Sequence, residues 1–193
     1  MYNNLITQRN LEGLRSLGYH IMDPAEGWLA CGITGVGRLP EPEAIVDWLE
    51  AKMCSTNELE GTTILVTAGG TQESIDPVRY IGNRSSGKMG YAIAEQAARM
   101  GAKVILVSAP TSLPIPSGVD FISVDSAVSM QEAVEARYND VNVVIMAAAV
   151  SDFRVLHKAE QKIKKMESMT IELVKNPDIL QGLGSKKNHQ ILV

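Results

Sequence analysis

From Thr62 onward, short runs of β-branched and apolar residues alternate with longer segments of helical periodicity. This alternation predicts a parallel sheet, because parallel strands need long crossover connections and these are usually helices. The pattern therefore indicates an α/β fold with a doubly wound, Rossmann-like and mostly parallel sheet that carries helices on both faces. The expected strands are 63–67, 103–108, 121–124 and 143–148, and the expected helices are 86–100 and 126–138.

The first 53 residues follow a different pattern, typical of an incomplete α/β tail that precedes the main domain. A helix is expected around residues 11–17, a short strand at 19–22, then a loop rich in glycine and proline. A second helix is expected from Pro42, since proline suits the first turn of a helix. The polar segment 54–61 ends in glycine and is the expected linker, which leaves 62–193 as the main domain.

Composition and charge exclude several classes of protein. The net charge of −4, from 18 basic and 22 acidic residues, argues against nucleic-acid binding through phosphate neutralisation. The longest apolar run, 143–150, is too short to span a bilayer, and the first 30 residues lack the pattern of a signal peptide. Cys31 and Cys54 are too few for a disulfide framework or a metal cluster. We expect a cytoplasmic protein without nucleic-acid or membrane partners.

Two glycines directly follow the first expected strand, where open α/β sheets bind their ligands. Gly69 and Gly70 permit a close approach of backbone N–H groups to a phosphate, or they simply form a strand-ending turn. A dinucleotide fingerprint requires a compact glycine motif that opens the helix, whereas about 15 residues intervene here. The second strand also leads into 108–110, Ser-Ala-Pro, without the acid that holds a ribose. Both features argue against an NAD-dependent oxidoreductase.

Residues 82–88 satisfy G-x-x-x-x-G-K, but the next residue is Met89. A P-loop needs a serine or threonine there as a magnesium ligand, so a P-loop NTPase is disfavoured. Ser85 and Ser86 lie at the expected helix start, where they either form an anion site with the free N–H groups or cap the helix. Asn83 either orients an acyl intermediate and its nucleophile or serves as a turn residue.

Three later segments add candidate contacts to a ligand. The alanines at 147–149 leave room for a base or sugar, or reflect tight packing, and Asp152 offers an acceptor. Asp178, within the segment 175–179, is either a helix cap or a metal–nucleotide contact. A polar segment carries a group of lysines that can close over a triphosphate or form a solvated loop. These lysines are Lys158, Lys162, Lys164 and Lys165.

Four stretches together resemble the synthetase half of the bifunctional phosphopantothenoylcysteine decarboxylase/synthetases. They are TAGGTQESIDPVRYIGNRSSGKMG at 67–90, AAAVSDF at 147–153, KIKK at 162–165 and VKNPDIL at 174–180, and they occur in the family's order. The resemblance implies a ligase of coenzyme A biosynthesis. CTP would activate the carboxylate of 4'-phosphopantothenate as an acyl-cytidylate with support from Mg²⁺, and the amine of L-cysteine would then displace CMP.

The same resemblance assigns roles to individual residues. Asn83 would act on the acyl intermediate, and Lys162 would stabilise charge during nucleotide transfer. Asp178 is the candidate contact to the metal. With the glycines and serines above, the expected nucleotide contacts are Gly69, Gly70, Ser85, Ser86, Met146, Ala147, Ala148, Asp152, Lys162, Pro177, Asp178, Ile179 and Leu180.

The N-terminal stretch resembles the end of the family's flavin-dependent decarboxylase half. TQRNL and ACGITGVGRLPEP occur there, and Cys31 stands at the position of the catalytic cysteine. Because the family places its flavin-binding strands upstream, FMN binding and decarboxylation are not expected of this chain. Residues 190–193 read as part of a strand, where the family continues further. The chain is expected to be a fragment of a protein that forms homodimers, and the competing hypothesis is a nucleotide-binding module without catalysis.

Overall fold

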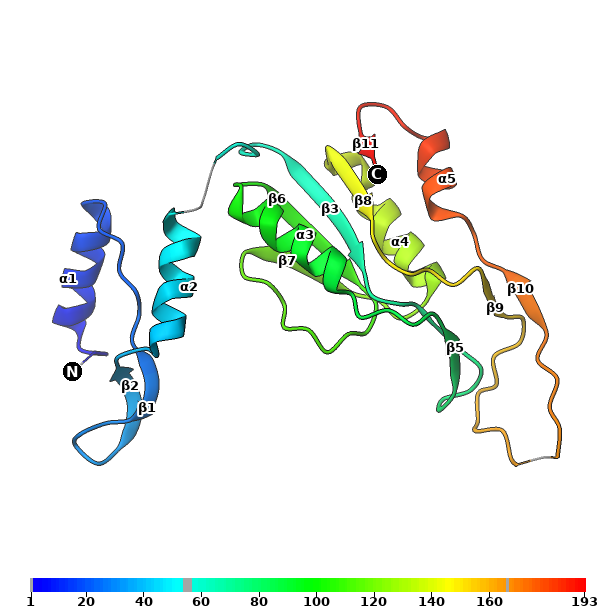
Figure 1. Ribbon diagram of the computed structural model, residues 1–193, viewed down its shortest axis with the longest axis horizontal. Helices are drawn as coiled ribbons and strands as arrows, with labels where there is room; N and C mark the ends of the chain where they lie inside the picture. Colours follow the sequence, from blue (N-terminus) through cyan, green and yellow to red (C-terminus); the bar gives the residue numbers. More distant parts are fainter. Residues whose placement is uncertain (1, 54–56, 166) are drawn as a thin grey trace. The chain divides into compact units, whose positions relative to one another are not determined.

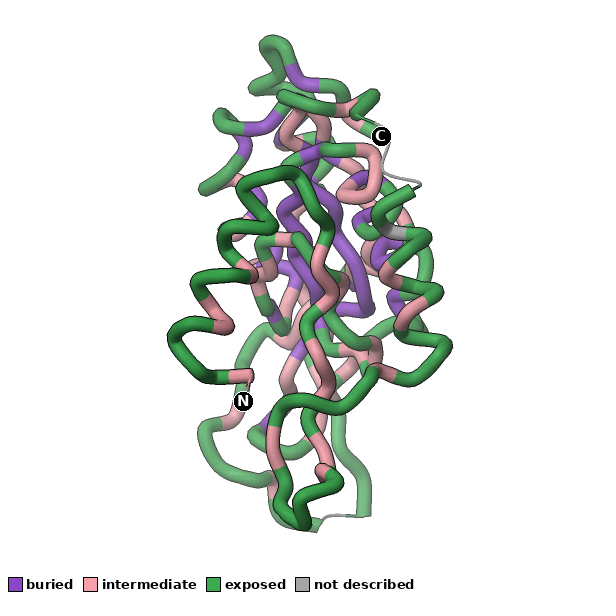
Figure 2. Tube along the Cα trace, turned by 90° about the vertical axis from the view of Figure 1, so that its left-hand side faces the viewer, coloured by how far each residue is buried: buried purple, intermediate pink, exposed green. Residues whose placement is uncertain are grey.

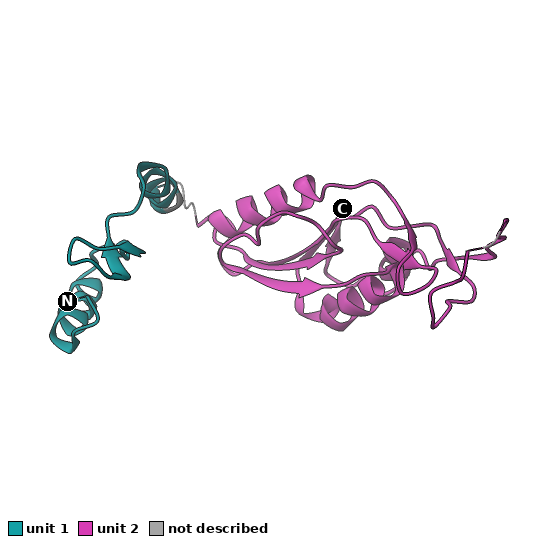
Figure 3. Cartoon of the chain, turned by 90° about the horizontal axis from the view of Figure 1, so that it is seen from below, with its two compact units in different colours: residues 1–55 teal, residues 56–193 magenta. Residues whose placement is uncertain are grey.

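The structure, a computed structural model, describes residues 2–53, 57–165 and 167–193. The chain divides into two compact units, residues 1–55 and residues 56–193 (Figure 3). The predicted linker, 54–61, begins outside the described residues. Its remainder, residues 57–61, belongs to the second unit, where the backbone N–H of Leu59 donates to the carbonyl of Met100 at 2.9 Å.

Within residues 2–53, the first unit contains two helices and one antiparallel hairpin. Helix α2 (Pro42–Met53) begins at the predicted proline. Helix α1 (Leu5–Ser16) overlaps the helix expected around 11–17 but begins six residues earlier. The strand expected at 19–22 is wrong, because that segment has no regular structure. Strands β1 (Ala25–Trp28) and β2 (Thr34–Arg38) pair instead within the expected loop, where backbone pairing offsets weak apolar patterning.

The second unit is built on a five-stranded parallel sheet, which confirms the predicted fold class. The strand order is β11-β8-β3-β6-β7, and every pair in it is parallel (Figure 1). Three strands lie close to their expected ranges, and β7 begins two residues before its expected start. The strands are β3 (Thr63–Ala68), β6 (Lys103–Ser108), β7 (Val119–Ser123), β8 (Val143–Met146) and β11 (Ile191–Leu192).

Helices cover both faces of this sheet. Successive side chains of β3 pack against different helices on the two faces. Leu65 packs on the face that is covered by α4 (Ala127–Arg137) and α5 (Ile179–Ser185). Its neighbours Ile64 and Val66 pack on the opposite face, against α3 (Lys88–Arg99). Because side chains alternate along a strand, an apolar strand buried on both faces serves two cores. Figure 2 shows the buried residues concentrated along the central strands.

Helix α3 differs from its prediction at its start and along its buried face. The N-cap is Gly87 at φ 74°, so the predicted cap by Ser86 is wrong. The spacing of apolar residues predicts a buried stripe of Met89, Ile93, Ala97 and Met100, but Met89 is 71% exposed. The residues that face the sheet are small or aromatic, namely Gly90, Tyr91, Ala94 and Ala97, because the helix lies close to β3. At the other end Gly101 has φ 89°, as expected of a C-terminal glycine.

Helix α4 follows its prediction closely. Ser126 is its N-cap and forms a capping box with Ser129, and a single 3₁₀ turn, Tyr138–Asp140, extends the helix. The buried residues Met130 and Val134 lie one turn apart and pack on the sheet. None of the helices within the described ranges is long and apolar enough to cross a membrane.

Two short antiparallel pairs extend beyond the central sheet and were missed by sequence pattern. Strands β4 (Gln72–Ser74) and β5 (Tyr80–Gly82) form a hairpin between β3 and α3, where the sequence pattern predicts no more than one short strand at 78–81. This hairpin is the physical reason why the glycines stand so far from the helix. Strands β9 (Phe153–Val155) and β10 (Leu173–Lys175) pair across a long connection.

We expect Gly90→Ala to destabilise the second unit by about 1–3 kcal/mol, because overpacking a tight contact forces the backbone to shift. An added Cβ would lie 2.7 Å from both the Cβ of Ala68 and the carbonyl oxygen of Thr67. Urea unfolding followed by circular dichroism measures the change. The control is Gly182→Ala in α5, where an added Cβ meets nothing within 4 Å and helix propensity favours alanine. Equal stability of the two variants would contradict the expectation.

Candidate functional site

The carboxyl end of β3 is tied directly to the segment after β8. The backbone N–H of Ala149 donates to the carbonyl of Gly69 at 2.8 Å, and that of Thr71 donates to the carbonyl of Ala149 at 3.2 Å. Both glycines are buried, and Gly69 has φ 79°. An added Cβ at Gly70 would lie 2.6 Å from the carbonyl oxygen of Asn83. The glycines are therefore required by the close approach of neighbouring main chains.

Side-chain hydroxyls and an amide fix the segment that follows β8. The backbone N–H of Ala148 donates to Oγ1 of Thr67 at 3.1 Å, and that of Ser151 donates to Oγ1 of Thr71 at 2.9 Å. Asn83 Nδ2 donates to the carbonyl of Val150 at 3.1 Å. Asn83 is thus held against the strand end, while the residue itself stays exposed.

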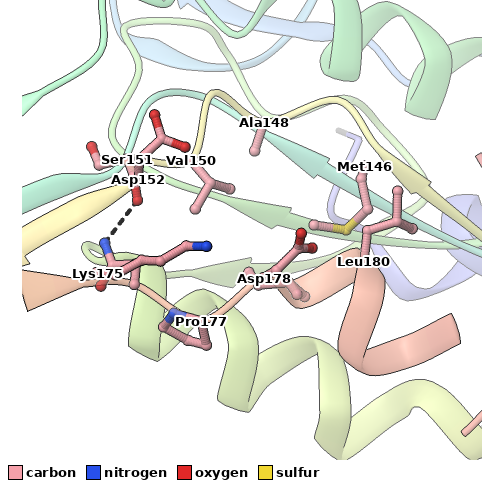
Figure 4. Close-up of a pocket in the computed structure, with 11 residues that line it drawn as sticks. Met146, Ala148, Val150, Ser151, Asp152, Lys175, Pro177, Asp178 and Leu180 are labelled. Carbon is pink, nitrogen blue, oxygen red and sulfur yellow. Dashed lines mark hydrogen bonds between the residues drawn. The ribbon is translucent and has the colours of Figure 1, made fainter. Parts of the chain in front are cut away.

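A pocket of about 310 Å³ opens between the end of β8, the end of β10 and the start of α5, a size suited to part of a small-molecule ligand. Figure 4 shows the side chains of Val150, Lys175 and Asp178 directed into the space between these elements. The structure brings together here seven of the predicted contacts and four other residues. The lining residues are Met146, Ala148, Val150, Ser151, Asp152, Lys175, Asn176, Pro177, Asp178, Ile179 and Leu180.

Asn176 holds two walls of this pocket together. Its backbone N–H donates to the carbonyl of Asp152 at 2.7 Å, and its Nδ2 donates to the carbonyl of Ser151 at 2.8 Å. Arg154 in turn donates through Nη1 to Oδ1 of Asn176 at 3.2 Å. Asn176 is only 5% exposed, and its amide is hydrogen-bonded to protein groups. Because solvent does not compete for these hydrogen bonds, Asn176 holds the pocket walls in place.

The hydroxyl of Ser151 has no hydrogen-bond partner among the described residues, although it is fully buried. Buried polar atoms in proteins almost always have a partner, and an unpaired one is costly. Because Ser151 lines the pocket, a polar ligand can supply that partner. The sequence patterns did not single out Ser151, Lys175 or Asn176. Their only signal was that they adjoin Asp152 and Pro177 at the ends of strands.

Asp178 serves as the N-cap of α5, since its Oδ1 accepts from the backbone N–H of Gln181 at 2.9 Å. This is the capping role that the sequence left open beside a metal contact. No group of three or more histidine, cysteine, aspartate or glutamate side chains within the described ranges can hold a metal ion. The protein side chains described here therefore do not fit a dedicated magnesium cage, and a metal role for Asp178 stays a prediction.

Ser85 and Ser86 lie in a different hollow, at the start of α3. They are exposed, and Oγ of Ser85 accepts from the backbone N–H of Gly87 at 3.3 Å. The positive end of the helix dipole faces this hollow, which favours an anion. The hollow has a volume of about 420 Å³. It is lined by Ser85, Ser86, Lys88, Pro110, Thr111, Ser112 and Leu113.

The remaining predicted residues lie outside both hollows. Ala147 follows β8 but is not among the residues that line the pocket there. Lys162 is exposed in the connection between β9 and β10. Its neighbour Ile163 is bound through the main chain to Asp76 and Arg79 of the β4–β5 turn. Cys31 is an exposed free cysteine in the first unit, and its role stays a prediction.

Comparison with known protein families gives two matches along the chain. Residues 59–193 match the DNA/pantothenate metabolism flavoprotein C-terminal domain, and residues 1–54 match the flavoprotein family. A relative named coenzyme A biosynthesis bifunctional protein CoaBC from Bacillus subtilis is 48% identical over 100% of this chain. The protein of the same name from Escherichia coli K12 is 47% identical over 98% of it. The chain spans about half the length of these relatives, 48% of each.

Solved structures lead to the same domain. The crystal structure of the C-terminal domain of a CoaBC protein matches with a TM-score of 0.64 and 50% identity, over 71% of this chain and 65% of that one. A DNA/pantothenate metabolism flavoprotein from Streptococcus pneumoniae matches with a TM-score of 0.61 and 26% identity, over 68% of each chain. The match at residues 59–193 spans more than half of this chain. The chain therefore belongs to the family of the DNA/pantothenate metabolism flavoprotein C-terminal domain, joined to a flavoprotein-family segment.

Proposed function

We propose that the second unit carries the nucleotide site of a phosphopantothenate–cysteine ligase that uses CTP and acts in coenzyme A biosynthesis. The observation that carries the proposal is the gathering of separate sequence motifs in one pocket. AAAVSDF and VKNPDIL lie far apart in the sequence, yet both line the hollow between β8, β10 and α5. The relatives that are nearly half identical along this chain are named for coenzyme A biosynthesis.

The lining suits a nucleoside better than a wholly charged ligand. Met146 and Leu180 offer apolar surface, and Ala148 leaves space beside them. Asp152 offers carboxylate acceptors to a hydroxyl or amino group, and the buried hydroxyl of Ser151 lacks a protein partner. A small number of polar groups on an apolar wall is typical of sites that orient a small molecule.

The anionic parts of the substrates would meet cationic and N–H groups at the pocket and beside it. Lys175 lines the pocket, and Lys88 stands in the hollow at the start of α3. Lys162 is exposed on the connection between β9 and β10, where its ammonium group is available to a developing negative charge. Magnesium would enter with the nucleotide phosphates, as it commonly does, and no step here is assigned to it.

The proposed reaction has two steps. A carboxylate oxygen of 4'-phosphopantothenate attacks the α-phosphorus of CTP, forms an acyl-cytidylate and releases pyrophosphate. The amine of L-cysteine then attacks the acyl carbon, the C–O bond to the phosphate breaks, CMP leaves and the amine loses a proton. Asn83 lies at the strand end with Nδ2 bound to the carbonyl of Val150. Its amide oxygen would accept from the attacking amine and so orient it.

The test is to incubate the purified protein with 4'-phosphopantothenate, Mg²⁺ and either CTP or ATP, with and without cysteine. Pyrophosphate and CMP are measured, and nucleotide binding is measured separately by calorimetry. The proposal predicts that pyrophosphate release requires CTP and that amide formation requires cysteine. Binding of CTP without turnover would favour the competing hypothesis of a non-catalytic nucleotide-binding module. Equal use of ATP would contradict CTP selectivity.

A further inference from the structure

The connection between β9 and β10 is long and has few attachments to the rest of the unit. Residues 156–165 and 167–172 contain no helix or strand. The backbone N–H of Leu156 donates to the carbonyl of Glu172 at 2.9 Å, which closes the base of this arm. The backbone N–H of Ala159 donates to the carbonyl of Ile75 at 2.9 Å. A lysine on such a connection has many accessible positions unless its own main chain is fixed.

The main chain next to Lys162 is bound on both of its polar groups by one ion pair, in which Asp76 is buried and Arg79 is partly exposed. Oδ2 of Asp76 accepts from the backbone N–H of Ile163 at 3.1 Å, and Nη2 of Arg79 donates to the carbonyl oxygen of Ile163 at 2.6 Å. Both polar groups of Ile163 are thus bound by residues more than 80 positions earlier. We call this set, Asp76, Arg79 and the main chain of Ile163, the arm clamp.

Asp76 is suited to this task because its carboxylate is both buried and fully used. Its side chain is 0% exposed, and Oδ1 accepts from the backbone N–H groups of Val78 and Arg79, each at 2.8 Å. Oδ2 also accepts from Nε of Arg79 at 3.0 Å. Burial alone raises the pKa of this carboxyl, but the N–H donors of Val78, Arg79 and Ile163 and the guanidinium of Arg79 outweigh it and lower the pKa to about 2. The clamp therefore holds a charged carboxylate at any pH well above that value.

We infer that Asp76 is a positioning residue for Lys162: it holds the arm so that the ammonium of Lys162 is presented to the nucleotide, an inference that rests on the proposed function. Fixing Ile163 restricts the adjoining residue to a small region before substrate arrives. Preorganised charge is worth more to a reaction than charge that must be ordered during it, and small misplacements are costly. The clamp would act on nucleotide transfer and leave the pocket of the nucleoside unchanged.

An asparagine cannot replace Asp76 in this arrangement. All four hydrogen bonds to the carboxylate come from N–H donors, whereas an amide has one acceptor oxygen and an NH₂ group that would face donors. Asp76→Asn keeps the size of the side chain and removes the charge that pairs with Arg79. It therefore releases Ile163 or the β4–β5 turn, with little change in packed volume.

The experiment is a double-mutant cycle with Asp76→Asn, Lys162→Gln and the variant that combines both. Single-turnover pyrophosphate release from CTP is measured, together with CTP affinity by calorimetry. We expect Asp76→Asn to slow pyrophosphate release at least about tenfold with CTP affinity kept within about threefold, since misplacement acts on the reacting geometry. In the Lys162→Gln background the same substitution is expected to add less than about twofold, because residues that act as a unit are not additive.

Two further measurements keep the inference open to contradiction. Ile163→Pro removes the N–H from the arm without altering Asp76, and it should reproduce the selective loss. Amide exchange at Ile163 should be slow in the unaltered protein and fast in Asp76→Asn. Glu95→Gln is the control, because it removes a carboxylate from a surface ion pair with Arg99 on α3. It should change neither rate nor exchange.

The outcomes separate the inference from the proposed function. Multiplying, independent losses for Asp76→Asn and Lys162→Gln would overturn the inference, and so would fast exchange at Ile163 in the unaltered protein. Absence of CTP-dependent pyrophosphate release in the unaltered protein would instead contradict the proposed function. In that case slow exchange at Ile163 would leave the clamp as a structural contact and would overturn its role in catalysis.

Discussion

Lys162→Gln is expected to slow pyrophosphate release from CTP by about 10²–10³-fold, the usual cost of removing one preorganised charge from a developing anion. Glutamine keeps a similar length and a hydrogen-bond donor but lacks the positive charge. Lys162 is exposed, and the substitution should change the free energy of unfolding by no more than about 0.5 kcal/mol. Rapid-quench measurement of pyrophosphate and urea unfolding test the two parts of this expectation.

Lys165→Gln provides a matched control for that experiment. It removes the same charge from the same KIKK motif, and Lys165 is also exposed. Because the arm clamp binds the main chain of Ile163, the order imposed by Asp76 and Arg79 is greatest beside Lys162. We expect Lys165→Gln to change the rate by less than about threefold. Equal losses in the two variants would show that the motif contributes only general positive charge, and an unchanged rate in Lys162→Gln would remove that residue from the mechanism.

The central sheet was predictable from sequence because its strands are buried on both faces. In β6, residues 104–107 are all buried, with side chains on both faces of the sheet, so the strand is visible in the sequence as an uninterrupted apolar run. Helix α4 was predictable for a different local reason, because Ser126 marks its start as an N-cap. Local physics decides these elements, and no distant contact is needed to see them.

The elements that were missed depend on contacts between distant or polar segments. Strands β9 and β10 have only three residues each and pair across a long connection, so no periodic pattern forms. Serine is a common helix cap, so the sequence offers Ser86 as a candidate cap of α3, yet the N-cap is Gly87 with φ 74°. An added Cβ on Gly87 would lie 2.7 Å from Cγ2 of Thr111, so a contact with the loop after β6 makes glycine necessary. Sequence spacing does not reveal such a contact.

The candidate site shows the same division. Motifs after β8 and before α5 are predicted to contact a ligand, and the structure gathers residues of both in one pocket. The structure does not place Ser85, Ser86 or Lys162 among the residues that line that pocket. Asn176 was seen only as part of a motif, because its role is to bridge Ser151 and Asp152. The sequence gives no pattern that predicts a bridging amide, apart from its position near the ends of the strands that it joins.

Gly70→Ala is expected to lower the rate of amide formation with cysteine by about 10²-fold, because it moves the residues that orient the intermediate. An added Cβ would lie 2.6 Å from the carbonyl oxygen of Asn83 and 3.3 Å from Cβ of Ser85. The first of these is a main-chain atom, so no side-chain rotation relieves the overlap. The segment 83–85 must shift, and Asn83 then loses its 3.1 Å hydrogen bond to Val150.

The same overlap should destabilise the second unit by about 1–3 kcal/mol, so activity has to be measured well below the unfolding transition. Gly184→Ala in α5 is the control, since an added Cβ there meets nothing within 4 Å. Amide formation is followed by mass spectrometry of the ligated product. A rate for Gly70→Ala within about twofold of the unaltered protein would show that the segment 83–85 yields without consequence. The rate of amide formation would then not depend on the position of Asn83 at the end of β8, and the orienting role proposed for this residue would be wrong.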